Sequence, residues 1–174
     1  MKKILTVIVL ILAVSIAVYK SSHKELHNYD EAINNYEYQY YNETATIIKI
    51  DSDSKSIKFE DICYKDKNDF NINISKNTKI IISLHDADTF KCWKVLCRLN
   101  SDSYKLNAYN FKADNVTPYE IVDGKKSLIL GYSPYRYNVV IEPKNEESFK
   151  LDLVYGYLES KEFSKILSFT INIM

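Results

Sequence analysis

The chain has 174 residues, of which 46% are hydrophobic, and its 23 basic side chains balance 23 acidic ones. A chain of this length can bury one substantial core, and because no excess of positive charge exists to neutralise phosphates, binding to nucleic acid is not expected. Only three glycines are present, Gly124, Gly131 and Gly156, so the glycine-rich phosphate-binding loops of the Rossmann and P-loop types are excluded.

The first predicted element is an export segment at residues 1–20. It begins with Met-Lys-Lys and continues with the apolar run ILTVIVLILAVSIAVY. This run is short for a membrane span, which needs about 20 residues, and fits the apolar region of a signal peptide. A cleaved signal peptide and a retained membrane anchor at residues 4–19 are both compatible with it. In either case we expect the rest of the chain outside the cytoplasm, secreted or anchored to the plasma membrane.

The next segments are a polar stalk and a hairpin. Residues 21–43 are polar and carry apolar side chains at loosely helical spacing, which indicates a stalk or a short helix. From residue 44 the hydrophobic pattern changes to a period of two, which is typical of strands. TATIIKI and SIKFEDI flank the turn sequence DSDSK, so residues 44–66 are expected to form a β-hairpin extension.

Residues 67–174 are predicted to form the main domain. They contain short segments of alternating hydrophobic residues, separated by turn-rich loops, namely FNINI, KIIISL, CWKVLCRL, YKLNAYNF, KSLIL, YNVVIE, FKLDLVY and KILSFTINI. We expect these inward rows: Phe70, Ile72 and Ile74; Ile80, Ile82 and Leu84; Trp93, Val95, Cys97 and Leu99; Phe149, Leu151, Leu153 and Tyr155; Leu167, Phe169, Ile171 and Ile173. This many short strands without an amphipathic helix predict an all-β antiparallel sandwich.

The segment DADTFKCW, residues 86–93, resembles the first loop of the chagasin-type inhibitors of papain-like cysteine proteases. That family has an immunoglobulin-like sandwich that presents three loops along one edge. Its first loop carries an Asn-Pro-Thr-Thr-Gly motif and is closed by an aromatic residue, a variable residue and a tryptophan. Thr89 and Trp93 match this pattern and Asp86 is close to its asparagine, whereas Phe90 and Lys91 depart from it.

The two other family loops are similar in place more than in sequence. LGYSPYRYNVVIE, residues 130–142, keeps the leading glycine of a Gly-x-Gly-Gly pattern and the strand that follows. FKLDLVYGYLESKEF, residues 149–163, keeps the strand that ends in tyrosine, but GYLE stands where the family has Arg-Pro-Trp. The resemblance covers roughly residues 68 to 174. Because the loop motifs match only in part, it lies mainly in strand order and loop placement.

The resemblance implies an immunoglobulin-like sandwich and contact roles for residues in three loops. The implied partner-binding residues are Asp86, Ala87, Asp88 and Thr89; Tyr132, Ser133, Pro134 and Tyr135; Tyr157, Leu158 and Glu159. The implied partner is a papain-like cysteine protease. The tyrosines are suitable anchors, because tyrosine is enriched among binding hot spots.

The three cysteines, Cys63, Cys92 and Cys97, allow at most one disulfide. Cys92 and Cys97 cannot bridge on one strand, because five strand residues span about 16 Å while a disulfide needs Cα atoms about 4.4–6.8 Å apart. If a disulfide forms, we expect it between Cys63 and Cys92. No Cys-x-x-Cys pair is present, so a zinc site is not expected.

The cluster HDAD, residues 85–88, contains residue types that bind metals and take part in catalysis. Asp86 and Asp88 could share a face and hold calcium weakly, but no further acidic ligands follow at the spacing of an EF-hand, and aspartate is common in turns. His85 is the only histidine in the strand-rich region, and no acid that would orient it is identifiable. The sequence therefore predicts neither a metal site nor a cofactor, and no enzyme.

The sequence leaves two hypotheses for function. The first is an exported, non-enzymatic binding module with a protein partner, which the resemblance narrows to an inhibitor of papain-like proteases. The second is a membrane-anchored structural or accessory envelope protein of unknown partner, assembling through sheet edges or its tyrosine-rich surface.

Overall fold

A computed structural model of the protein describes residues 29–36, 38, 43–86, 91–96, 101–113, 119–122, 125–128, 135–157 and 162–174. The chain divides into two units, Met1–Tyr36 and Glu37–Met174. In the first unit residues 29–35 form a short helix, one of the two forms expected for the polar segment. The expected signal or anchor, residues 1–20, lies outside the described residues. Among the helices that are described, none is long and apolar enough to cross a membrane.

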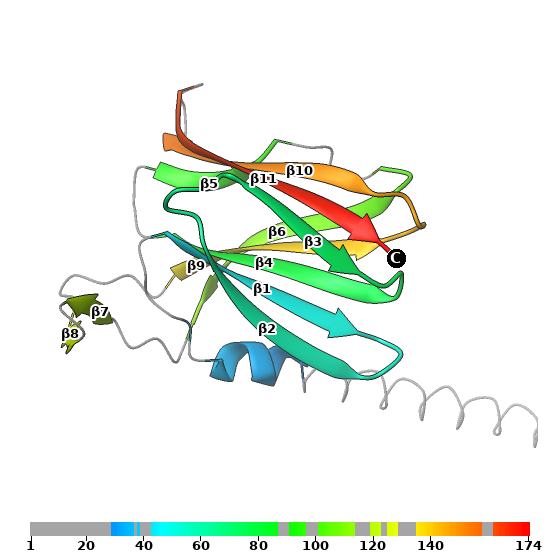
Figure 1. Ribbon diagram of the computed structural model, residues 1–174, viewed down its shortest axis with the longest axis horizontal. Coiled ribbons are helices and arrows are strands. Elements are labelled where there is room, and N and C mark those ends of the chain that lie inside the picture. The colour runs from blue at the N-terminus through cyan, green and yellow to red at the C-terminus, as the bar shows by residue number, and fades with distance from the viewer. Residues whose placement is uncertain are drawn as a thin grey trace, which may run out of the picture. The chain divides into compact units, whose positions relative to one another are not determined.

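The second unit is built from β-strands (Figure 1). In chain order they are β1 Thr44–Asp51, β2 Ser56–Cys63, β3 Asp69–Ile74, β4 Thr78–His85, β5 Lys91–Val95, β6 Tyr104–Lys112, β7 Tyr119–Val122, β8 Lys125–Leu128, β9 Tyr135–Pro143, β10 Phe149–Tyr157 and β11 Phe163–Ile173. The sequence predicted all of these strands except β7. The sequence pattern did not single out β7, whose residues are YEIV.

The strands form two main sheets that stack as two layers (Figure 1). Sheet A has five strands in the order β2-β1-β4-β9-β6, and sheet B has four strands in the order β3-β11-β10-β5. β7 and β8 pair only with each other, as a separate two-stranded sheet. This arrangement confirms the expected all-β sandwich.

One strand pair departs from the expected antiparallel pattern. β3 runs parallel to β11, with Phe70 opposite Phe169 and Ile74 opposite Ile173. The cause is the connection, because the short segment between β2 and β3 moves the chain from sheet A to sheet B at one end of the sandwich. β3 and β11 then both run away from that end. The other strand pairs in the described part of the chain are antiparallel.

The hairpin expected at residues 44–66 is formed, with Thr44 opposite Cys63 and Asp51 opposite Ser56. It is not an extension, however, because β1 also pairs along its length with β4 and lies inside sheet A. The division into a hairpin at 44–66 and a sandwich at 67–174 is therefore corrected to a single sandwich. The physical reason is that β1 carries apolar side chains on both faces, including the buried Ile47 and Ile48, as is typical of a central strand.

The core lies between sheets A and B and contains the described residues of the inward rows predicted from the sequence. Cys97 and Leu99 of those rows lie outside the described residues. Fully buried side chains from both sheets meet there, among them Ile80, Ile82, Leu84, Val139, Ile141, Leu151, Leu153, Leu167, Phe169 and Ile171. The ring of Phe70 stacks on Phe169 at 5.3 Å, and Tyr104 of sheet A contacts Phe149 of sheet B at 4.4 Å. Each large apolar side chain buried in this way contributes about 1.5–3 kcal/mol to stability before entropy is subtracted.

Candidate functional site

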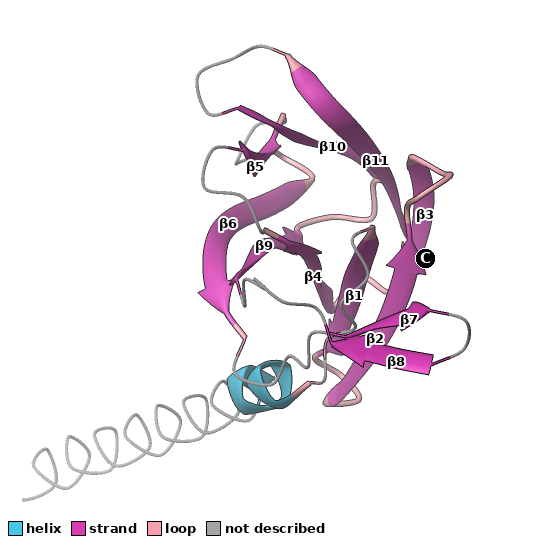
Figure 2. Cartoon of the chain, turned by 90° about the vertical axis from the view of Figure 1, so that its left-hand side faces the viewer, coloured by secondary structure: helices cyan, strands magenta, loops and turns pink. Residues whose placement is uncertain are grey.

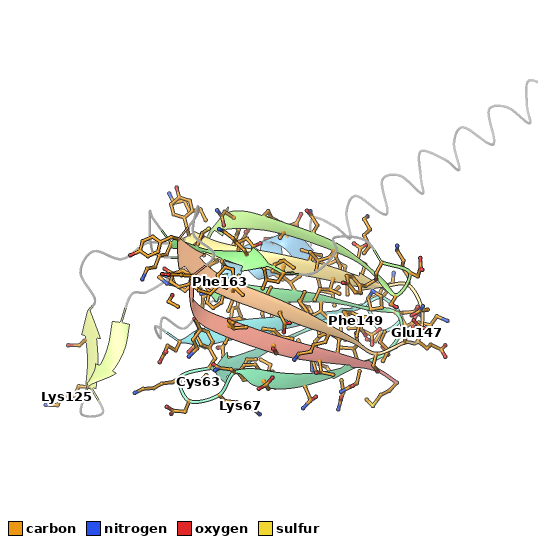
Figure 3. The ribbon with its side chains drawn as sticks, turned by 90° about the horizontal axis from the view of Figure 1, so that it is seen from above. Cys63, Lys67, Lys125, Glu147, Phe149 and Phe163 are labelled. Carbon is orange, nitrogen blue, oxygen red and sulfur yellow. The ribbon has the colours of Figure 1, made fainter. Side chains whose placement is uncertain are left out.

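The strands that flank the three expected loops reach the same end of the sandwich. β4 finishes there at His85, opposite Arg136 of β9, and β10 finishes there at Tyr157, opposite Lys91 of β5. We call this the loop end; Figure 2 looks toward it. In Figure 3 Cys63 and Phe163 lie toward the loop end, and Glu147 and Phe149 lie at the other end.

The first and second loops are joined where they leave the sheet. The backbone N–H of Asp86 donates to the carbonyl oxygen of Tyr135, with the two atoms 3.0 Å apart. This bond extends the β4–β9 pairing beyond His85 and Arg136. Asp86 at the start of the first loop and Tyr135 at the end of the second loop therefore have a set separation. The side chain of Asp86 is buried.

The flanks of the first and third loops are also linked, here by side chains. The side chain of Lys94 donates to the carbonyl oxygen of Tyr157 at 3.0 Å, and the ammonium of Lys91 lies 5.0 Å from the centre of the Tyr157 ring. Lys91 lies just after the contact residues of the first loop, and Tyr157 is the first contact residue of the third loop. Cation–π contacts of this exposed kind contribute about 0.5–1 kcal/mol, enough to bias the orientation of the ring.

Tyr135 and Tyr157 are the expected anchor residues that the structure describes. Their exposed fractions are 50% and 53%, so both rings are available to a partner at the loop end. The other residues implied as contacts, Ala87, Asp88, Thr89, Tyr132, Ser133, Pro134, Leu158 and Glu159, lie outside the described residues. Their contact roles stay predictions.

Gly156 shapes the start of the third loop. A Cβ at this position would lie 2.7 Å from the carbonyl oxygen of Glu162 and 3.1 Å from the ring of Phe163. The pairing of β10 with β11 is interrupted by a bulge at this point, between Tyr155 and Gly156. Because the two strands approach so closely, glycine is the residue that fits here.

A pocket of ≈ 300 Å³ opens at the loop end, inside the second unit. It is lined by Glu43, Tyr64, His85, Trp93, Tyr155, Ser164 and Lys165. Tyr64 and Trp93 meet edge to face at 5.9 Å, and Trp93 and Tyr155 lie 5.1 Å apart. The indole N–H of Trp93 donates to the carbonyl oxygen of His85 at 3.0 Å. Sequence analysis predicted Trp93 as core, which its burial confirms, but it did not predict this pocket.

The sequence also missed a buried polar cluster on the outer face of sheet A. The guanidinium of Arg136 is fully buried and donates to the side-chain oxygen of Ser83 at 2.8 Å and to the Ser83 carbonyl at 2.9 Å. It also lies 3.5 Å from the side-chain oxygen of Thr46 and 4.4 Å over the ring of Tyr38. Arg136 therefore fastens the start of β9 to β4 directly beside the first and second loops.

One signal in the sequence could have revealed this cluster. In TATIIKI and KIIISL both alternation rows are largely apolar or small, and near-continuous runs of this kind indicate strands buried on both faces. Thr46 and Ser83 occupy the outer row, opposite each other in the β1–β4 pairing. Arg136 and Asn138 continue that row on β9, and the buried side-chain amide of Asn138 has no hydrogen-bond partner among the residues that the structure describes.

The expected Cys63–Cys92 disulfide is not formed, since both residues have free thiols. The reason is strand alternation. Tyr64 and Trp93, which follow the two cysteines, point inward and touch, so the cysteines themselves point outward from different sheets. Cys63 is exposed, and burial raises the pKa of the Cys92 thiol.

No cluster of three or more His, Cys, Asp and Glu side chains suited to a metal is found in the part of the chain that the structure describes. Asp88, the second aspartate weighed for calcium, lies outside that part. Two of the residues that line the pocket, Glu43 and Lys165, form an ion pair, whose carboxylate oxygen and ammonium are 3.5 Å apart.

Comparison with known proteins gives one similar solved structure to report. It is the crystal structure of the cysteine protease inhibitor EhICP2 from Entamoeba histolytica, which is 16% identical, covers 63% of this chain and 91% of that chain, and superposes with a TM-score of 0.43. No protein-family model and no curated protein sequence matches the chain.

Proposed function

We propose that the second unit is a non-enzymatic binding module that contacts a protein partner through the loop end, and that the partner is a papain-like cysteine protease. The first part rests on the geometry of the loop end. The second part rests on the resemblance of residues 68 to 174 to the chagasin-type inhibitors, whose three loops bind such proteases.

The observation that carries the proposal is the meeting of the three loop flanks. Asp86 is hydrogen-bonded to Tyr135, and Lys91 pairs with Tyr157. Because the flanks of the three loops lie at one end of the sandwich, we expect a partner that contacts one loop to lie beside the other two. Loops that are held by paired strands lose little conformational entropy on docking, which favours affinity.

The chemistry of the loop end suits a contact with a protein better than catalysis. The half-exposed rings of Tyr135 and Tyr157 supply amphipathic contact area with few rotatable bonds. An inhibitor of this kind fills a protease cleft with loops and offers no bond in a position to be cleaved. The aromatic rings then serve as anchors and the loop backbones as hydrogen-bonding groups.

Inhibition of papain and several related proteases by the full-length chain tests the proposal. We expect inhibition at nanomolar concentration, and loss of it when Asp86–Thr89 is replaced by a Gly-Ser segment of the same length. The matched control is the same replacement at Ser52–Lys55, the turn between β1 and β2 at the other end of sheet A. The bonds donated by the backbone of Ser52, Asp53 and Ser54 do not depend on the replaced side chains. The exposed bond from Asn77 to the Asp53 carboxylate is lost in this control.

Single substitutions sharpen the test. Tyr135→Ala and Tyr157→Ala should each raise the inhibition constant about tenfold or more, because truncation of an anchoring tyrosine costs upward of about 1.4 kcal/mol. Tyr109→Ala is the control, since Tyr109 is a comparably exposed tyrosine on the outer face of sheet A. Absence of inhibition by the unaltered chain at micromolar concentration, across the whole protease set, would refute the protease as partner.

A further inference from the structure

We propose that the pocket at the loop end binds a free aromatic α-amino acid in its zwitterionic form. The ligand would place its ring among Tyr64, Trp93 and Tyr155, and its two charged groups on Glu43 and Lys165. This site is separate from the loop contacts proposed above and does not depend on protease binding.

The charges of the pocket select a ligand with no net charge. Glu43 stands before β1 of sheet A and Lys165 lies on β11 of sheet B, and their charged groups are 3.5 Å apart. The side chains are 37% and 22% exposed, so each can be reached from solvent. A ligand with a single charge would take one partner and leave the other uncompensated in a half-buried site, which is costly. A zwitterion exchanges one ion pair for two.

Lys165 already places an ammonium group beside an aromatic ring of the pocket. The ammonium lies 5.4 Å from the centre of the Tyr64 ring and 3.4 Å from the carbonyl oxygen of Lys65. Lysine has a flexible stem, so its ammonium can turn from Glu43 toward a ligand carboxylate. The freed Glu43 carboxylate then accepts from the ligand ammonium.

The aromatic walls select the side chain of the ligand. Trp93 contacts Tyr64 edge to face and Tyr155 at a tilt, so the wall is a packed aromatic cluster, against which a further aromatic ring can pack favourably. Burial raises the pKa of the Tyr64 phenol, which keeps this wall neutral. The volume of ≈ 300 Å³ is at the lower end of the range for small-molecule pockets and suits a ligand the size of one amino acid.

The walls are held in place by bonds that a ligand does not need to break. The Trp93 indole donates to the His85 carbonyl at 3.0 Å, and the Ser164 hydroxyl donates to the Tyr155 carbonyl at 3.1 Å. A pocket with rings fixed in this way loses little entropy when it is filled.

Trp93 is the only tryptophan of the chain, so its fluorescence reports directly on the pocket. We would titrate the full-length chain with L-phenylalanine and excite at the red edge of tryptophan absorption, where the ligand does not absorb. We expect a saturable change in emission at concentrations up to about 10 mM. N-acetyl-L-phenylalanine lacks the ammonium and L-phenylalaninamide lacks the carboxylate. Each should bind at least about tenfold more weakly than L-phenylalanine, because each loses one charged contact.

Variants test the assignment of the two charges. Glu43→Gln and Lys165→Met should each weaken binding of L-phenylalanine about tenfold, as the blocked ligands do. Lys150→Met is the matched control, because Lys150 is a more exposed lysine near the other end of β10, and it should leave binding unchanged. Absence of a saturable change for L-phenylalanine, or equal affinity for the blocked derivatives, would overturn the proposal. The comparison of L-phenylalanine with its two blocked derivatives uses the unaltered chain, so it tests the proposal even where a variant fails to fold.

Discussion

Replacement of Trp93 by alanine tests how the loop end is attached to the core. Trp93 is 4% exposed and contacts the rings of Tyr64 and Tyr155. Truncation of a buried tryptophan to alanine costs about 3–5 kcal/mol. Each aromatic pair adds about 0.5–1.5 kcal/mol beyond area burial, so we expect the upper half of that range. Because a domain of this size has about 5–15 kcal/mol in total, this cost is a large part of its stability.

The assay is urea unfolding followed by circular dichroism, because the variant has lost the fluorescent probe. Two matched variants divide the effect. Trp93→Phe keeps a ring but removes the indole donor of the His85 carbonyl, and should cost about 1–2 kcal/mol. Leu96→Ala removes a side chain that is 54% exposed just after β5, and should cost no more than about 0.5 kcal/mol. A cost for Trp93→Ala as small as that for Leu96→Ala would refute the assignment of Trp93 to the core.

Three further predictions concern the other features. Arg136→Met should lower the free energy of unfolding by about 2–4 kcal/mol, because it leaves buried acceptors without their donor, and Arg136→Lys should cost less. Both are measured by urea unfolding, and equal, small costs would contradict a stabilising role of Arg136 in the buried cluster. Iodoacetamide should modify Cys63 faster than Cys92, because burial raises the pKa of the Cys92 thiol and lowers its thiolate fraction; peptide mass mapping measures this, and a Cys63–Cys92 peptide in an unreduced digest would contradict the free thiols. The hydrogen bond from Lys79 holds the pKa of Glu142 below its usual range, so the pair stabilises the fold above the unfolded-state pKa and loses this effect as the pH falls through the folded-state value. Glu142→Gln should therefore cost less than about 1 kcal/mol at neutral pH, since the pair is exposed, and nothing in acid; an equal cost at both pH values in urea unfolding would contradict the assignment.

The inner rows could be predicted from the sequence because strand geometry has a period of two. Ile80, Ile82 and Leu84 alternate with other residues in one segment, and Leu151 and Leu153 do so in another. Once one face of each segment is apolar, the face that packs on the opposite sheet follows. All five side chains are buried between the sheets.

Features that depend on which strands become neighbours could not be predicted. The parallel pairing of Phe70 with Phe169 follows from the path between sheets, which no local pattern encodes. The ion pair of Glu43 with Lys165 joins residues from the start and the end of the sandwich. Arg136 was not expected inside, because arginine is mostly exposed, and its burial depends on oxygens that β1 and β4 supply.

The loop end combines groups that stabilise the sandwich with groups available to a ligand, and their exposure separates the two roles. Trp93 and Arg136 are buried, so their replacement changes stability and binding together and cannot assign a function. Tyr157 and Lys165 keep a part of their side chains in solvent. Their replacement should remove a proposed binding contact at small cost to the fold. If loss of Tyr157 affects only protease inhibition and loss of Lys165 affects only binding of the amino acid, the loop end holds two separate sites. If each loss affects both inhibition and amino-acid binding, the pocket and the loops act as one site.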